Sequence, residues 1–260
     1  MELGKRLRKC RVIDTAEVDR IIEKSSHKIS FSAIRQCILA NDLPEEYRNA
    51  IRRDAYDILK IEHQLKDYFA ILSDIYDYHP EKINIGEMER DFFLKVRETL
   101  DTRMDVKMFF PKDKDNLFLY VDKERLEYAI LELILNAQQH AVTEPDIRKE
   151  LRIWVSCAGR GIRFSISDNG LGMDEEEISH CCEPGFSMSE DQNSLGLGLC
   201  LVRYFAGVCH GKFDLSSEKG KGTTVKLTVP QAMEEELLGV SSAKIEQKKY
   251  PTPVDIMLGV

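Results

Sequence analysis

The chain has 260 residues, of which 43% are hydrophobic and 32% are charged, and it carries a formal net charge of -8. This length suffices for one or two domains with a sizeable core, and the acidic balance excludes the basic surface of a nonspecific nucleic-acid binder. No stretch reaches the ~18 uninterrupted apolar residues of a transmembrane helix, and the N-terminus lacks the apolar segment of a signal peptide. Because its seven cysteines show no paired C-x-x-C spacing, we expect a cytoplasmic protein without a disulfide framework or a zinc site.

The first 82 residues predict a helical domain. One face of a first helical segment carries apolar residues at Val18, Ile22, Ile29, Ala33 and Cys37. After a turn at 41–46, apolar residues run from Tyr47 to Ile75 in steps of four and three, and His79-Pro80 is expected to end this second helix. Such a heptad repeat is typical of helices that pack along a seam. We therefore expect a hairpin that dimerises into a four-helix bundle, although packing against the following domain would bury the same face.

Residues 83–232 predict a second domain of mixed strands and helices. The expected helices are 88–100, 122–141, a short acidic helix after Asp174 and a helix from Gly196. The expected strands lie near 105–110, 117–121, 151–157, 161–167, 212–217 and 223–229. The chain is thus predicted to be α+β, with a helical hairpin followed by an α/β sandwich whose helices cover one face of a mixed sheet. Residues 233–260 are expected to form a tail outside the core.

Two polar residues stand together on the predicted helix 122–141. Glu132 and Asn136 are four residues apart, so their side chains share a face that differs from the face of Ile130 and Ile134. An amide oxygen can hold Mg²⁺ near phosphates while a carboxylate orients or deprotonates a nucleophile. The alternative is an ordinary solvated helix face.

A glycine-containing loop follows the predicted strand 161–167. Asp168 supplies an acceptor of the kind that an adenine amino group needs, and Gly170 and Gly172 allow the main chain to approach a base closely. Met173 could pack on the ring of the base. An ordinary Asn-Gly turn would have the same local sequence.

A second pair of glycines opens the predicted helix from Gly196. Gly196 and Gly198 alternate with Leu197 and Leu199, and main-chain N–H groups at a helix start can hold phosphate oxygens. The irregular stretch 183–193 before it predicts a mobile lid. Farther along, a hydroxyl at Thr223 could join Asp168.

These motifs, in this order, resemble the catalytic ATP-binding domain of sensor histidine kinases, within the Bergerat-type (GHKL) superfamily that includes gyrase and mismatch-repair ATPases. The N box resembles LELILNAQQHA, which ends at His140, the G1 box resembles DNGLGM, the F box EPGFSMS and the G2 box SLGLGLCLVRYFAGVCHG. The resemblance covers roughly residues 84–230 and implies ATP and Mg²⁺ as cofactors, with Asn136 as the metal ligand. The cofactor-binding residues that it implies are Asn136, His140, Asp168, Gly170, Gly172, Met173, Gly196, Leu197, Gly198, Leu199 and Thr223.

The helical hairpin resembles the dimerisation and phosphotransfer domain of the same kinases, which implies a phosphoacceptor histidine on its first helix. His27 points away from the apolar face of that helix, as an acceptor must. Lys28 stands where an acid usually follows the histidine, and Ser32 replaces the usual proline, so an ordinary exposed histidine is the alternative. Glu132 would be the base for attack by His27 or, without a presented histidine, would activate water.

The resemblance as a whole implies an ATP-dependent protein-histidine kinase of a two-component system. It would phosphorylate its own histidine, pass the phosphate to the receiver domain of a response regulator and act as a homodimer. Four departures favour an alternative, a weakened phosphotransfer or scaffold module. Lys28 and Ser32 are the two beside His27, Gln139 replaces a basic residue that often contacts phosphate, and the stretch 183–193 contains no lysine or arginine. A plain GHKL-type ATPase is a further alternative.

Overall fold

The computed structural model describes residues 60–73, 75–100, 104–141, 148–187 and 195–232. These residues fall into two units, one that includes residues 60–76 and one that begins at Asp77. The predicted hairpin up to residue 59, with His27, and the tail 233–260 lie outside the described residues.

The described part of the first unit is a helix over residues 60–72, within the second helix predicted from the heptad pattern. The helix ends earlier than expected: a turn follows at Ser73, and residues 75–79 before Pro80 are not helical. Serine favours such an end since its side chain competes for main-chain hydrogen bonds. Ile75, a predicted seam residue, is 72% exposed. The prediction that His79-Pro80 ends the helix is therefore wrong.

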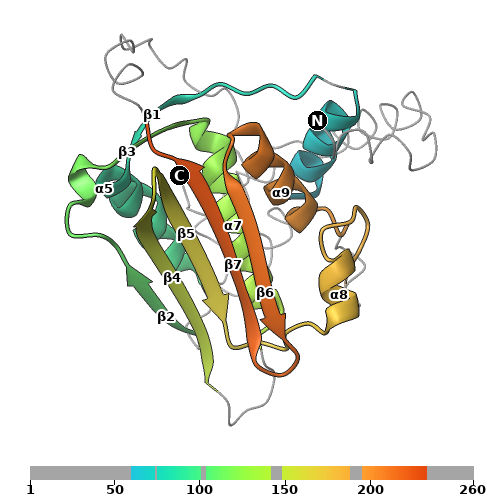
Figure 1. Ribbon diagram of the computed structural model, residues 1–260. Coiled ribbons are helices and arrows are strands. Elements are labelled where there is room, and N and C mark those ends of the chain that lie inside the picture. Colours follow the sequence, from blue (N-terminus) through green and yellow to red (C-terminus); the bar gives the residue numbers. More distant parts are fainter. Residues whose placement is uncertain (1–59, 74, 101–103, 142–147, 188–194, 233–260) are drawn as a thin grey trace, which may run out of the picture. The chain divides into compact units, whose positions relative to one another are not determined.

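The second unit is built on a five-stranded sheet (Figure 1). Its strands are β2 (Met104–Phe109), β4 (Lys149–Ala158), β5 (Gly161–Asp168), β7 (Gly222–Pro230) and β6 (Lys212–Glu218), in that order across the sheet. Strands β2 and β4 are parallel, and the other neighbours are antiparallel. All five strands lie within two residues of their predicted positions, and the predicted mixed sheet is confirmed.

Alternating side chains give this sheet one apolar face. In β4, Leu151, Ile153 and Val155 are buried, whereas Trp154 between them is 53% exposed. Burial of such a strand face contributes about 25 cal/mol per Å² of apolar surface removed from water, and only one of the two faces is covered in this way. The apolar face therefore fixes which side of the sheet the helices occupy.

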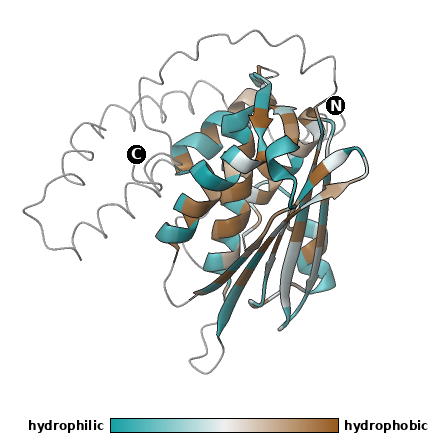
Figure 2. Cartoon of the chain, turned by 90° about the vertical axis from the view of Figure 1, so that its left-hand side faces the viewer, coloured by the Kyte–Doolittle hydropathy of each residue, from teal (hydrophilic) through white to brown (hydrophobic). Residues whose placement is uncertain are grey.

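Three helices lie close to their predicted positions: α7 (Lys123–Gln139), α8 (Glu175–His180) and α9 (Gly198–Val208), which begins two residues after the predicted start at Gly196. Helices α7 and α9 contact each other and the sheet, and the side view shows the helices of this unit gathered on one side of the sheet (Figure 2). Asp122 caps α7 by accepting a hydrogen bond from the Arg125 N–H, and Asp174 and Glu177 form a capping box at α8. The α+β fold with helices on one face of the sheet is thus confirmed.

A small second layer was only partly predicted. Strand β1 (Glu81–Asn84), which the sequence pattern did not reveal, pairs antiparallel with β3 (Phe118–Val121). After β1, the chain is helical through α5 (Ile85–Met88), the π-helical turn η1 (Glu89–Phe93) and α6 (Leu94–Thr99). A strand of four residues is too short for period-two alternation to stand out from other patterns, which explains why β1 was missed.

Candidate functional site

Asp168 ends strand β5 and holds two other segments by hydrogen bonds. Its Oδ1 accepts the main-chain N–H of Gly170 at 2.8 Å and that of Thr223 at 3.2 Å. Burial raises the pKa of the Asp168 carboxyl, and the main-chain hydrogen bonds from Gly170 and Thr223 act in the opposite direction. A half-buried carboxylate of this kind is a specific acceptor for a ligand N–H donor.

The glycines of the Asp168 loop (residues 168–173) are required by close neighbours. A Cβ on Gly170 would lie 2.3 Å from the carbonyl oxygen of His140, and one on Gly172 would lie 2.0 Å from that of Glu218. Gly172 also has a φ of 61°, which other residues rarely adopt. The main chain of this loop is thus pressed between the end of α7 and the end of β6.

His140 joins the Asp168 loop through its main chain. Its carbonyl oxygen accepts the Leu171 N–H at 3.0 Å, while its own N–H donates to the carbonyl oxygen of Asn136 at 3.0 Å. His140, at the end of the predicted N box, therefore connects the Asp168 loop to Asn136, which lies about one helical turn earlier on α7.

A hydroxyl cluster fixes the far side of the same loop. Ser217 Oγ accepts the Met173 N–H at 2.8 Å and lies 2.8 Å from the hydroxyl oxygen of Thr223. The hydroxyl of Thr223 thus contacts Ser217, and its main-chain N–H is the group that contacts Asp168. Met173 itself is 7% exposed. The sequence did not predict Ser217 as a site residue, because a serine in an edge strand belongs to no recognisable motif.

Asn169 is a second residue that the motif reading did not use. Its side-chain oxygen accepts the Glu150 N–H at 2.7 Å, and its amide nitrogen donates to the carbonyl oxygen of Arg148 at 2.8 Å. Asn169 therefore holds the start of β4 beside the Asp168 loop. Its position directly after Asp168 was the available signal, since asparagine commonly bonds to main-chain groups in turns.

Glu132 and Asn136 on α7 meet the first residue of α9. A Cβ on Gly198 would lie 2.7 Å from Glu132 Oε2 and 3.7 Å from Asn136 Nδ2. Glu132 is 1% exposed, whereas Asn136 is half-buried. The start of α9, where main-chain N–H groups are not used within the helix, therefore lies against the predicted carboxylate and carboxamide pair.

Gly196 holds the F box next to this helix start. It has a φ of 63°, and a Cβ on it would lie 2.4 Å from the carbonyl oxygen of Phe186. Its own carbonyl oxygen accepts the Gly185 N–H at 3.2 Å. Leu197 is buried and Leu199 is half-buried on α9. The structure thus packs the predicted F box against the predicted G2 box.

Oxygen donors decide whether Mg²⁺ would fit. The amide oxygen of Asn136 and the carboxylate of Glu132 are hard oxygen donors on one helix face, which is the chemistry that Mg²⁺ prefers together with phosphate and water oxygens. No cluster of three or more His, Cys, Asp or Glu side chains suitable for a metal occurs among the described residues. These residues fit a metal held jointly by the protein and a phosphate ligand.

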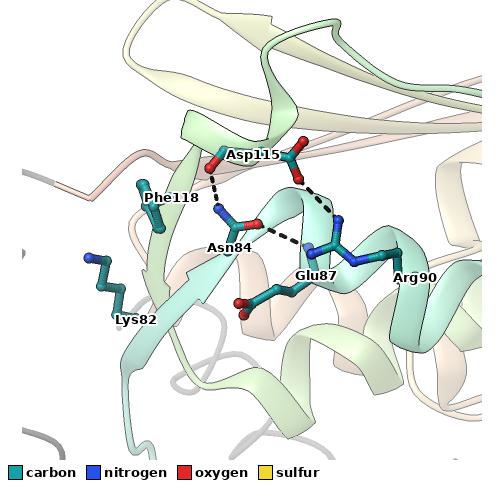
Figure 3. A pocket seen from close by; sticks show the side chains of 6 residues that line it. All are labelled: Lys82, Asn84, Glu87, Arg90, Asp115 and Phe118. Carbon is teal, nitrogen blue, oxygen red and sulfur yellow. Dashed lines mark hydrogen bonds and ion pairs between the residues drawn. The ribbon is translucent and has the colours of Figure 1, made fainter.

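A polar pocket of about 440 Å³ lies elsewhere in this unit (Figure 3). Asn84 bridges it by donating to the carbonyl oxygen of Asp115 at 2.8 Å, and Arg90 pairs with the Asp115 carboxylate at 3.1 Å. Lys82 lies over the Phe118 ring, 4.3 Å from its centre. None of the predicted site residues lines this pocket. Its lining side chains pair largely with one another, which indicates a structural role.

Comparison with known proteins gives one matching family over the second unit. Residues 121–233 match the family described as "Histidine kinase-, DNA gyrase B-, and HSP90-like ATPase". This stretch contains α7, the Asp168 loop, α9 and the strands β4 to β7. The resemblance drawn from the N, G1, F and G2 boxes is thereby confirmed. Within the described part of the chain, no helix combines the length and the apolar character needed to cross a membrane.

Two sensor proteins and one solved structure illustrate these similarities. The phosphate regulon sensor protein PhoR of Haemophilus influenzae is 28% identical over 120 residues, which cover 45% of this chain and 27% of PhoR. The autoinducer 2 sensor kinase/phosphatase LuxQ of Vibrio parahaemolyticus is 24% identical over 238 residues, or 84% of this chain and 27% of LuxQ. The structure of full-length ShkA in complex with AMPPNP shares the fold, with a TM-score of 0.57 and 16% identity over 85% of this chain and 46% of ShkA. The match thus spans about a quarter of the length of these two curated relatives.

Proposed function

Since residues 121–233 carry the ATPase domain shared by histidine kinases, DNA gyrase B and HSP90, we propose that the chain is an ATP-dependent protein-histidine kinase of a two-component system. It would phosphorylate His27 and pass the phosphate to an aspartate on the receiver domain of a response regulator. The observation that carries this proposal is the meeting of Glu132, Asn136 and Gly198 at the start of α9, on the same helix whose end supports the Asp168 loop.

Asp168 would recognise the adenine of ATP. Both hydrogen bonds from Gly170 and Thr223 end on Oδ1, and Oδ2 is the oxygen that would accept a hydrogen bond from the exocyclic amino group. The close contacts of Gly170 with His140 and of Gly172 with Glu218 would hold the main chain of the Asp168 loop in a fixed position at the edge of the base, with Met173 beside it. Adenine would thus be distinguished from guanine, which carries an acceptor oxygen at the corresponding position.

The phosphate groups would lie at the start of α9. Main-chain N–H groups after Gly196 and Gly198 would donate to phosphate oxygens, where the helix dipole favours negative charge. Asn136 would hold Mg²⁺, which supplies positive charge against the phosphates when bound.

Glu132 would act on the attacking group. In the transfer step, a ring nitrogen of His27 would form a bond to the γ-phosphorus as the bond to the ADP oxygen breaks, and Glu132 would accept the ring proton. The position of Glu132 beside the Cα of Gly198 supports this role, because it places the carboxylate next to the proposed phosphate end. His27 itself belongs to the part of the chain that the structure does not describe.

Labelling with γ-³²P-ATP tests the proposal. Purified full chain should acquire acid-labile, alkali-stable label, which should disappear in His27→Ala and persist in the control His79→Ala. Glu132→Gln should slow labelling while leaving ATP binding, measured by calorimetry, within about threefold of the unchanged chain. Label that survives His27→Ala would overturn the assignment of the acceptor. ATP binding without any label would instead favour a scaffold, and steady phosphate release independent of His27 would favour an ATPase.

A further inference from the structure

Two neighbouring cysteines lie between helix α8 and the F box. The Sγ atoms of Cys181 and Cys182 are 3.8 Å apart. Cys181 is buried, and its single thiol proton is within hydrogen-bond reach of two acceptors, the carbonyl oxygen of Ile178 at 3.2 Å and the sulfur of Cys182, which is half-buried. The side chain of Arg203, from helix α9, lies close enough to Cys182 for its positive charge to favour the thiolate. A pair of thiols thus shares one site with a cation, and one member is accessible.

We propose that Cys182 is a peroxide-reactive thiol, that Cys181 is its resolving partner, and that oxidation of the pair changes the turn that supports Gly196. The hydrogen bond from Cys181 and the charge of Arg203 both lower the pKa of the Cys182 thiol, against the effect of its burial. The hydrogen bond with Cys182 and burial both raise the pKa of the Cys181 thiol. One proton therefore stays on Cys181 and Cys182 gains thiolate character, which is the reactive form of cysteine.

The other described cysteines lack this combination. Burial raises the pKa of Cys200 to about 12 and that of Cys209 to about 11. Cys157 is exposed on β4 and has no second thiol in contact among the described residues. Accessibility, a stabilising cation and an adjacent thiol occur together only at Cys182 within the described part of the chain.

The chemistry proceeds in two balanced steps. The Cys182 thiolate attacks one oxygen of a hydroperoxide, so that an S–O bond forms as the O–O bond breaks, and the departing oxygen takes up a proton to leave as an alcohol or as water. The sulfur loses two electrons and the peroxide gains them. The Cys181 thiol then attacks the sulfur of the sulfenic acid, an S–S bond forms, and the hydroxyl leaves as water with the proton of Cys181.

The resulting bond must alter the local main chain. A trans peptide holds consecutive Cα atoms at about 3.8 Å, which is shorter than the about 4.4–6.8 Å usual for disulfides, so the bond can close only if the torsions around this peptide change. The turn that would have to yield is held by the Glu183 N–H, which donates to His180 at 2.7 Å, and by the Gly185 N–H, which donates to Gly196 at 3.2 Å. His180 Nδ1 and Glu183 Oε2, on the same turn, also lie 3.0 Å apart. A change at the thiol pair would therefore reach Gly196, which lies two positions before the first residue of α9.

Dimedone, which traps sulfenic acids, tests the thiol chemistry on the full reduced chain treated with hydrogen peroxide. Peptide mass spectrometry should show a Cys181–Cys182 disulfide in the unchanged chain and a lasting dimedone adduct on Cys182 in Cys181→Ser. The unchanged chain should lose thiol at Cys182 at least about tenfold faster than at Cys157. Arg203→Gln should slow this loss several-fold, and Arg160→Gln should not. Equal rates at Cys182 and Cys157 would overturn the proposal, and a disulfide from Cys182 to any other cysteine would overturn the role of Cys181.

The link to the nucleotide rests on the proposed function and is measured separately. Oxidation should weaken Mg-ATP binding about tenfold in the unchanged chain, dithiothreitol should restore it, and Cys182→Ser should show no such response. Unaltered affinity in a chain shown to be oxidised would overturn the link to Gly196. A reduced chain that binds no ATP would count against the kinase, while the mass spectra would still decide the thiol chemistry.

Discussion

The adenine end and the phosphate end of the proposed site are held in different ways. At the adenine end, the Asp168 loop is joined to α7, to β6 and to the start of β7 by hydrogen bonds from Leu171, Met173 and Thr223. At the phosphate end, α7 and α9 meet at Gly198, which has no side chain. A Cβ at this position would lie 2.7 Å from Glu132 Oε2. One end is fixed by main-chain bonds, and the other depends on an absent side chain.

This difference separates two requirements of the site. Recognition of a base needs a rigid acceptor, and three segments distant in the sequence hold Asp168 in place. Phosphate chemistry needs close approach between a helix start and reactive side chains, and a glycine provides the space without adding a bond. We therefore expect changes at the adenine end to affect stability and affinity, and changes at the phosphate end to affect turnover.

The largest effect is expected at Gly222, which stands at the start of β7. Its φ is 107°, and a Cβ on it would lie 2.1 Å from the carbonyl oxygen of Asp168. Gly222→Ala should lower the free energy of unfolding by about 3 kcal/mol or more, from main-chain strain and from the displaced loop. Gly220→Ala is the matched control, because Gly220 has a φ of 77° in the same turn but no atom within 4 Å of an added Cβ. It should cost only about 1–2 kcal/mol in urea unfolding. Equal losses would show that the approach to Asp168 does not constrain this turn.

The next effect concerns affinity at Asp168. Asp168→Asn keeps an Oδ1 acceptor for Gly170 and Thr223 but removes the charge-assisted bond proposed for adenine. Calorimetry should show Mg-ATP binding weaker by roughly 2 kcal/mol, or about 30-fold, with little change in melting temperature. Asp174→Asn serves as control, because asparagine also caps helices well, and its affinity should be unchanged. If both variants bind ATP equally, Asp168 does not contact the base.

Motif order was sufficient to single out the segments that the structure brings together at the proposed site, because the boxes report local needs of the main chain. The glycines of the Asp168 loop and the polar pair on α7 stand out by residue type and spacing alone. The strands of the sheet were equally readable, since their alternation of buried and exposed residues is set by one covered face. The sequence thus predicted the second unit well at the level of elements and motif positions.

Contacts between distant segments were not readable in the same way. Ser217 lies 44 residues from Met173 and nevertheless accepts its N–H, and nothing in the sequence around either residue indicates that pairing. Thr223 was expected to reach Asp168 through its hydroxyl, but the register of β6 and β7 places Ser217 opposite Thr223. The main-chain N–H is left to bond to Asp168. Register between strands decides such partners, and local sequence does not specify it.

A smaller effect should separate stability from turnover at the phosphate end. Gly198→Ala adds a good helix former to α9, but its Cβ would displace the Glu132 carboxylate. We expect the free energy of unfolding to change by less than about 1 kcal/mol, and the rate of labelling by γ-³²P-ATP to fall at least about tenfold. Gly207→Ala, in the same helix with no atom within 4 Å of its Cβ, should add roughly 0.5–1 kcal/mol of stability and leave labelling unchanged. Unaltered labelling in Gly198→Ala would remove the argument that close approach at α9 serves the chemistry.

The smallest effect is a pH dependence whose sign distinguishes a buried carboxyl from an exposed one. Burial holds the pKa of Asp168 above its ordinary value of 3.8, so the folded chain binds this proton more readily than the unfolded chain. The stability of the unchanged chain relative to Asp168→Asn should therefore rise as pH falls from 7 toward 4. Glu177 provides the opposite case, because its hydrogen bond with Lys219 lowers its pKa from 4.5, and relative stability against Glu177→Gln should fall over the acidic part of the same range. Urea unfolding at several pH values measures both differences. The same sign for both would mean that Asp168 is more exposed to solvent than its half-buried place at the end of β5 implies. It would also weaken the assignment of Asp168 as the rigid acceptor of the adenine end.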